Sequence, residues 1–175
     1  MRHIISVLVE NEFGVLSRIA GLFSGRGFNI ESLCVAEGID PTISTMTIVT
    51  TGNEAILEQI LKQLNKLINV IKVTDFKEMD YVSREMILVK LHTDEKTRAE
   101  ILRMAEIFRG KIIDVSPKTY TLLVTGDEEK LKAFLALVKP IGIKELVRTG
   151  AVAIARGEKT IKPKEIQNKG GEADG

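Results

Sequence analysis

The chain has 175 residues, which is room for one ordinary domain or two small ones. Hydrophobic residues make up 44% of it and charged residues 28%, so a disordered chain is excluded and a soluble globular protein is indicated. The 25 Lys and Arg nearly balance the 24 Asp and Glu, and this net charge of +1 argues against charge-driven binding to nucleic acid or to a membrane surface.

The location of the protein is indicated by three absences in the sequence. The single cysteine, Cys34, excludes an internal disulfide, and no apolar run approaches the roughly 20 residues of a membrane span. The N-terminus moves straight into strand-like sequence and lacks the apolar region and cleavage site of a signal peptide. We therefore expect a cytoplasmic protein.

The first half of the sequence predicts the order strand, helix, strand, strand, helix, strand. Residues 2–9 are β-branched and apolar and end at a polar cluster, which is typical of a strand and its turn. Apolar residues then recur at helical spacing from Phe13 through Leu16 to Phe23, and Gly25 ends this predicted helix. The remaining predictions are strands over 29–36, 43–51 and 70–76 and a helix over 56–68.

The second half repeats this order after a charged stretch that ends near residue 79. The strands are predicted over 86–91, 111–115, 120–125 and 147–155, and the helices over 101–108 and 131–138. The order βαββαβ is that of the ferredoxin-like fold, in which two helices cover one face of a four-stranded antiparallel sheet. We predict an α+β protein with two such domains in tandem, at 1–78 and 79–157, and a mobile tail over 158–175.

The first strand carries apolar residues toward both faces of its sheet. Ile5, Val7 and Val9 point to one face, and Ile4 and Leu8 point to the other. Since the two helices cover only one face, we expect the other face or an edge of the sheet to meet a further surface. A homodimer, a higher homo-oligomer or a large protein partner is predicted.

Catalytic groups are scarce in this sequence. It contains no HExxH, GxSxG, CxxC or Walker motif, so we predict no catalytic residue, no metal site and no cofactor in this chain. His3 and His92 are interpreted as ordinary surface histidines, and Cys34 as a small buried hydrophobic residue. The eight aromatic residues do not form the base-stacking platform of an RNA-binding sheet, because four of them lie on predicted helical faces: Phe13, Phe23, Phe108 and Phe134.

The turn from the first strand into the first helix, Asn11 to Arg18, is the candidate binding site. A helix N-terminus can bind a carboxylate, Gly14 leaves room for it, and the Asn11 amide suits a ligand that carries an ammonium group beside a carboxylate. The alternative is that Asn11 merely caps the helix and Gly14 merely relieves crowding. Asn29, at the start of the second strand, need not lie near Asn11 within one chain but could meet it across a dimer interface.

Residues 5–33, ISVLVENEFGVLSRIAGLFSGRGFNIESL, resemble the opening ACT domain of the regulatory small subunit of acetohydroxyacid synthase, also called acetolactate synthase. The resemblance continues at Asp40-Pro41, over 44–48 and in the second half over 107–115, and it covers residues 1–157. It implies a non-catalytic regulatory subunit in branched-chain amino acid biosynthesis. The partner is then the large catalytic subunit, which carries thiamine diphosphate, Mg²⁺ and FAD.

The resemblance also implies that the protein activates its partner and confers feedback inhibition by valine. In that family, ACT domains of two chains enclose the effector. The family pattern maps onto one set of residues in this sequence: Asn11, Gly14, Val15 and Leu16 of one chain, with Asn29 and Ile30 of the other. Phe13 and Cys34 depart from common family residues, so leucine or isoleucine stays open as the effector.

Three rival functions remain at this point. An ACT protein could act on another enzyme or on a transcription factor, and co-purification with a large thiamine-diphosphate enzyme would separate the two. An RNA-binding module of the same fold would bind single-stranded RNA in a salt-dependent way. An independent enzyme would turn over pyruvate without a partner.

Overall fold

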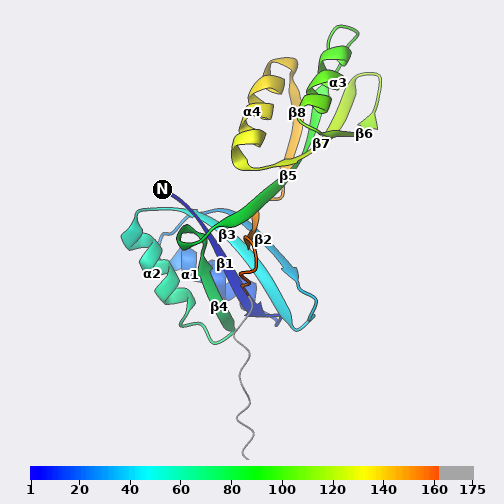
Figure 1. Ribbon diagram of the computed structural model, residues 1–175. Helices are drawn as coiled ribbons and strands as arrows, with labels where there is room; N and C mark the ends of the chain where they lie inside the picture. Colours follow the sequence, from blue (N-terminus) through cyan, green and yellow to red (C-terminus); the bar gives the residue numbers. More distant parts are fainter. Residues whose placement is uncertain (162–175) are drawn as a thin grey trace, which may run out of the picture.

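The computed structural model describes residues 1–161, and Figure 1 shows two units, each with its helices on one face of a sheet. The first unit is a four-stranded antiparallel sheet of strand order β2-β3-β1-β4. Its elements are β1 (Arg2–Glu10), α1 (Val15–Gly25), β2 (Ile30–Glu37), β3 (Ile43–Thr51), α2 (Glu54–Leu64) and β4 (Val70–Asp75), followed by the short helix η1 (Phe76–Glu78). This is the βαββαβ order that the sequence predicts.

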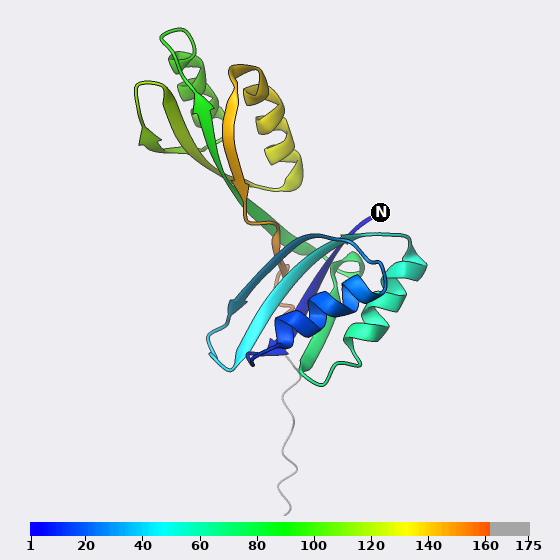
Figure 2. The ribbon, with the colours of Figure 1, turned by 180° about the vertical axis from the view of Figure 1, so that it is seen from behind.

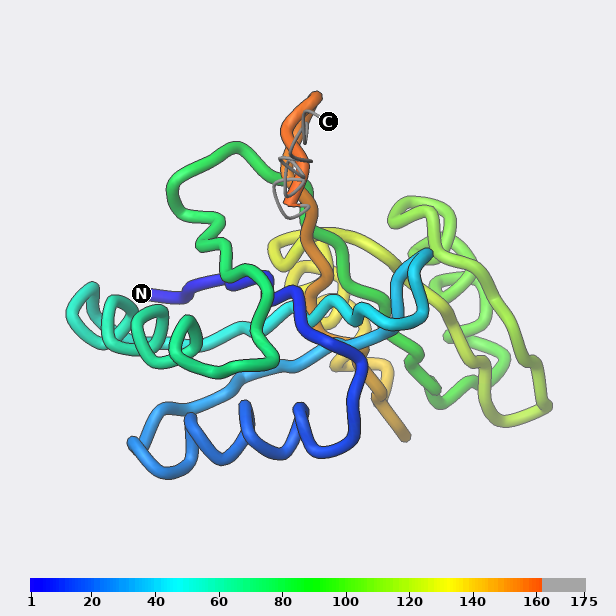
Figure 3. The backbone as a smooth tube through the Cα atoms, turned by 90° about the horizontal axis from the view of Figure 1, so that it is seen from below, coloured from blue at the N-terminus to red at the C-terminus, as the bar shows by residue number. Residues whose placement is uncertain are grey.

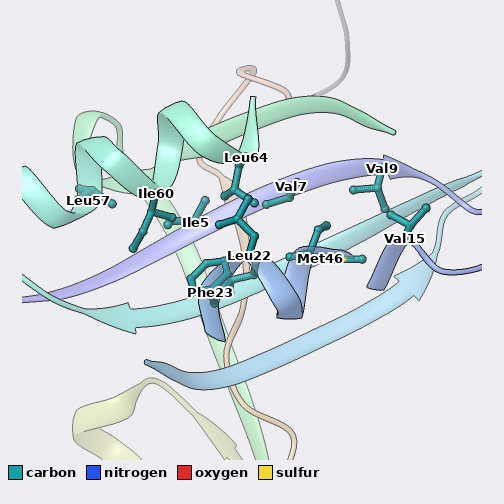
Figure 4. Packing of buried hydrophobic residues seen from close by; sticks show 12 residues of the cluster. Ile5, Val7, Val9, Val15, Leu22, Phe23, Met46, Leu57, Ile60 and Leu64 are labelled. Carbon is teal, nitrogen blue, oxygen red and sulfur yellow. The ribbon is translucent and has the colours of Figure 1, made fainter. Parts of the chain in front are cut away.

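The core of the first unit lies between the sheet and its two helices (Figure 4). Ile5 and Val7 of β1 are fully buried there, against Ile60 of α2 and Phe23 of α1. Each such side chain contributes roughly 1.5–3 kcal/mol by leaving water. The alternation of β1 therefore fixes which sheet face the helices cover.

The second unit has the same order and its own core. Its strands are arranged β6-β7-β5-β8, and its buried residues include Ile87 and Val89 of the central strand and Phe134 of the last helix. Its elements are β5 (Tyr81–His92), α3 (Arg98–Ile107), β6 (Lys111–Val115), β7 (Thr119–Gly126), α4 (Glu128–Val138), the short helix η2 (Lys139–Ile141) and β8 (Ile143–Arg148). Figure 2 shows α3 and α4 together on one face of this sheet.

Strand β5 belongs to both units. Its first residues, 81–84, pair with the last strand, β9 (Val152–Ala155), whereas residues 87–91 pair with β8 in the second sheet. The two-stranded ribbon of β5 and β9 lies over the helix-free face of the first sheet (Figures 1 and 3). There Ala151 and Ala153 pack with Ile4 and Val49, and all four side chains are buried.

This ribbon changes one argument from the sequence. The apolar residues on the second face of β1 led us to expect that this face, or an edge of the sheet, meets a further surface. The face is covered, and what covers Ile4 and its neighbour Val49 of β3 is the chain's own ribbon. The burial of this face therefore does not test the predicted homo-oligomer or large protein partner.

The α+β fold class with two ferredoxin-like domains is confirmed, and one strand boundary was wrong. A single last strand over 147–155 does not form, because Gly150 adopts a φ of 77° and the chain changes sheets there. Phe13 lies outside α1 and is fully exposed. The boundary at residues 78 and 79 stays a prediction, and most of the predicted tail lies outside the described residues. No helix within residues 1–161 is long and apolar enough to cross a membrane.

Candidate functional site

The turn between β1 and α1 is held against the β2–β3 hairpin by Asn11. Its backbone N–H donates to the carbonyl oxygen of Thr42 at 2.7 Å, and its Nδ2 donates to the carbonyl oxygen of Pro41 at 2.8 Å. The alternative that Asn11 caps the helix was therefore wrong, because its side chain is bonded to the hairpin and α1 has no side-chain cap. Asn11 anchors the turn.

Gly14 is the N-cap residue of α1 and has a φ of 84°, in the left-handed region that favours glycine. A Cβ atom built on Gly14 would meet no atom within 4 Å, so the residue does not relieve crowding. The space that a side chain at Gly14 would enter is open. Of the four α-helices that the structure describes, α1 alone has neither a side-chain cap nor an acidic residue in its first turn.

In the second unit, the corresponding turn lies between β5 and α3, and a carboxylate of the turn binds its backbone N–H groups. Asp94 Oδ1 accepts hydrogen bonds from the backbone N–H groups of Lys96 and Thr97, both at 2.9 Å, and from the Thr97 hydroxyl at 3.0 Å. The backbone bond from Thr97 is the main reason that the pKa of Asp94 is lowered. In the second unit, a carboxylate therefore binds the backbone N–H groups of this turn, whereas the N-terminus of α1 in the first unit has no side-chain cap.

The other two predicted site residues, Asn29 and Ile30, follow the C-terminal end of α1. Asn29 is exposed and precedes β2, and its carbonyl oxygen accepts a hydrogen bond from the Thr50 hydroxyl at 2.6 Å. Ile30 is half-buried against the core. Because α1 has 11 residues, about 16 Å of helix separates this end from Gly14.

One chain alone does not bring the six predicted site residues together. Asn11, Gly14, Val15 and Leu16 cluster at the start of α1, where Val15 is buried and Leu16 is 44% exposed. Strand β2, which carries Ile30, is an edge strand of the first sheet. A second chain would have to supply the other half of the set.

Sequence reasoning missed a buried asparagine beside this turn. Asn69 is 7% exposed and lies just before β4. Its Nδ2 donates to Glu10 Oε2 at 2.7 Å and to Glu12 Oε2 at 3.1 Å, and its Oδ1 accepts from Arg18 Nη1 at 2.7 Å. The one available signal was a polar residue between the apolar residues Ile68 and Val70.

The histidines and the cysteine do not form a catalytic site. His3 is 4% exposed, with Nε2 3.1 Å from the carbonyl oxygen of Gly52, so the expectation of a surface histidine was wrong. Cys34 is half-buried and lines an apolar groove of about 440 Å³ between the first sheet and the ribbon. Within residues 1–161, no group of three or more His, Cys, Asp or Glu side chains is placed to hold a metal ion.

Comparison with known proteins gives two family matches. Residues 5–72 match the family described as the AHAS small subunit-like ACT domain, and residues 84–157 match the family described as the small subunit of acetolactate synthase. A probable acetolactate synthase small subunit of Methanothermobacter thermautotrophicus is 54% identical over 160 residues, covering 91% of this chain and 95% of that protein.

Two further relatives extend this likeness. The acetolactate synthase isozyme 3 small subunit of Escherichia coli is 51% identical over 163 residues, covering 93% of this chain and all of that protein. The crystal structure of the acetolactate synthase small subunit from Thermotoga maritima matches with a TM-score of 0.82 at 42% identity, over 91% of this chain and 99% of that chain.

Proposed function

Because this chain belongs to the family of acetolactate synthase small subunits, we propose that it is the non-catalytic regulatory subunit of an acetolactate synthase in branched-chain amino acid biosynthesis. Its partner is the large catalytic subunit. Thiamine diphosphate, Mg²⁺ and FAD belong to that partner in this proposal and none of them to this chain. The two subunits act together in the cytoplasm.

The regulatory site is the start of α1. The main observation that supports this assignment is the state of the helix N-terminus. The helix N-terminus has a left-handed glycine, no side-chain cap and no acidic residue in its first turn. Its backbone N–H groups and partial positive charge suit the carboxylate of an amino acid. We propose valine as the feedback effector, with leucine and isoleucine as the alternatives to be compared.

A homodimer completes the site. In the sheet, the end of β2 lies across β3 from the end of β1, because Glu37 pairs with Ser44 and Ser44 pairs with Val9. Antiparallel pairing of β2 with β2 of a second copy would set the start of one β2 beside the end of the other. Asn29 and Ile30 of one chain then approach the Gly14 turn of its partner.

Each residue has a distinct role in this arrangement. The backbone N–H groups after Gly14 bind the carboxylate, the Asn29 amide orients the polar end of the ligand, and Asn11 holds the turn. Leu16 and Ile30 contact the branched side chain. Micromolar to millimolar binding corresponds to about −4 to −8 kcal/mol, which a few charge-assisted hydrogen bonds and a small apolar group can supply.

The test is an assay of the purified large subunit from the same source with pyruvate as substrate. Addition of this protein should raise the rate several-fold, and subsequent titration with valine should lower it. Leucine and isoleucine are titrated in parallel to rank the effectors. A rate that neither this protein nor any of the three amino acids changes would refute the proposal.

A further inference from the structure

Asn69 is bonded to both sides of the turn that carries Asn11 and Gly14. On the strand side it makes two hydrogen bonds with Glu10 and one with Glu12: its backbone carbonyl oxygen accepts from Glu10 N at 2.9 Å, and its Nδ2 donates to both carboxylates. On the helix side its Oδ1 accepts from Arg18. The Arg18 backbone N–H in turn donates to the carbonyl oxygen of Gly14 at 3.0 Å.

These bonds fix the spacing between the end of β1 and the start of α1. Asn69 lies on a different part of the chain, in the connection between α2 and β4. A buried amide with both of its polar atoms hydrogen-bonded is costly to displace. The turn is therefore tied at two points to one buried residue.

The same amide restrains two negative charges beside the helix N-terminus. Glu10 and Glu12 each place Oε2 within hydrogen-bond distance of the one Nδ2 atom of Asn69. Like charges held this close repel each other, and a donor that both of them bind offsets this repulsion. Without that donor, the Glu12 side chain would be released two residues before the N-cap Gly14.

The second unit shows what a carboxylate does at such a turn. There Asp94 binds the backbone N–H groups of Lys96 and Thr97 itself. A released Glu12 carboxylate would be drawn to the positive end of α1 in the same way and would compete with a ligand carboxylate. We propose that Asn69 is a positioning residue of the effector site, which holds the turn and keeps Glu12 away from the helix N-terminus.

This inference rests on the proposed function, because it concerns the same site. The test variant is Asn69→Asp, which removes the donor and keeps an acceptor for Arg18. The matched control is Asn65→Asp, since Asn65 is exposed in the same connection and its Nδ2 donates only to the backbone oxygen of Leu61, at 2.9 Å. Valine binding is measured by calorimetry on the full chain, together with activation of the large subunit.

Asn69→Asp should weaken valine binding by about tenfold or more, as expected for loss of a hydrogen bond to a charged group, while activation stays within about twofold. Asn65→Asp should leave both unchanged. The decisive variant adds Glu10→Gln and Glu12→Gln to Asn69→Asp. In this triple variant, the swap variant, the two glutamines supply the donors and the aspartate supplies the acceptor. The affinity for valine should therefore return to within about threefold of wild type. If Asn69→Asp acted only by unfolding the protein, the two added substitutions would not restore the affinity.

Amide hydrogen exchange supplies a readout that does not depend on the ligand. Residues 11–17 should exchange faster in Asn69→Asp and recover their protection in the swap variant. Unchanged exchange in Asn69→Asp, or unchanged valine affinity, overturns the inference. If the wild-type chain binds no branched-chain amino acid, the proposed function fails instead, and the effector role of Asn69 fails with it.

Discussion

Gly150 lies against Ser32 so closely that a Cβ atom added to the glycine would be 2.7 Å from the Ser32 Cβ. The connection from β8 to β9 passes here over strand β2 of the first sheet. The backbone at Gly150 has a φ of 77°, in the left-handed region that favours glycine. At this point the backbone turns from the second sheet toward the ribbon.

Gly150→Ala should destabilise the protein by about 2–4 kcal/mol, because a left-handed alanine and an overpacked contact add their costs. Gly157→Ala is the matched control, since its φ is 71° and nothing lies within 4 Å of an added Cβ atom. That variant should lose about 1 kcal/mol. Urea denaturation measures both, and equal losses would show that the Ser32 contact has no role.

Arg148 pairs with a buried carboxylate in the second sheet. Its Nε and Nη2 donate to the two oxygens of Glu85 at 2.6 and 2.9 Å, and Glu85 is 5% exposed. The hydrogen bond to Glu85 is the main reason that the pKa of Arg148 is raised. Removing the cation would leave the carboxylate buried without its partner.

Arg148→Met should therefore lower the free energy of unfolding by about 2–3 kcal/mol, somewhat less than for a fully buried pair because the arginine is partly exposed. Lys90→Met is the control, since the Lys90–Glu145 pair lies on the same sheet but is largely exposed. Its loss should be much smaller, because solvent screens an exposed ion pair. A similar loss in both variants, measured by denaturation, would contradict this account.

Glu128 links the two units through Arg2, whose Nη1 lies 2.7 Å from Glu128 Oε2, and Arg2 also pairs with Glu31 of β2. The pKa of Glu128 is lowered from 4.5, chiefly by the hydrogen bond from Lys132 and also by the charge of Arg2. A carboxylate with a lowered pKa in the folded state stabilises the fold above its unfolded-state pKa. This contribution is lost as the pH falls through the lower, folded-state value.

Glu128→Gln should consequently be less stable than wild type at pH 7, and the difference should fade as the pH drops below about 4.5. Thermal unfolding between about pH 3 and 7 measures it, and added salt should reduce it because the groups are partly exposed. Glu129→Gln makes the same change of charge at the next, exposed residue. A difference from wild type that is independent of pH would rule out the ion pairs as its cause.

Substitution of Gly14 tests the proposed effector site directly. Gly14→Asp places a carboxylate where the ligand carboxylate is proposed to bind, so the valine concentration for half-inhibition should rise by about tenfold or more. Gly14→Asn is the control, because Asn and Asp tolerate a left-handed φ about equally and differ in charge. It should keep more of the valine response, and both variants should still activate the large subunit. Valine sensitivity retained in Gly14→Asp would move the site elsewhere.

The sequence was enough to predict the repeated βαββαβ order, because β-branched runs such as β1 end at polar turns and apolar residues recur at helical spacing between them. It did not predict the ribbon, since the pairing of Tyr81 with Ala155 joins residues far apart in sequence. The Gly14 turn was identifiable from its residue types. The position of Asn69 was not, because its partners Glu10 and Arg18 are more than 50 residues away.

The shared strand β5 also determines the order in which the chain can assemble. The two strands of the ribbon are separated in sequence by residues 85–151, and closing an unfolded loop of that length costs about 4 kcal/mol. Folding of the second sheet brings the two ends together, so the ribbon forms after that sheet. During synthesis, the first unit therefore emerges with the Ile4 and Val49 face of its sheet open to water. That apolar face stays uncovered until residue 155 has left the ribosome and β9 can pair with β5.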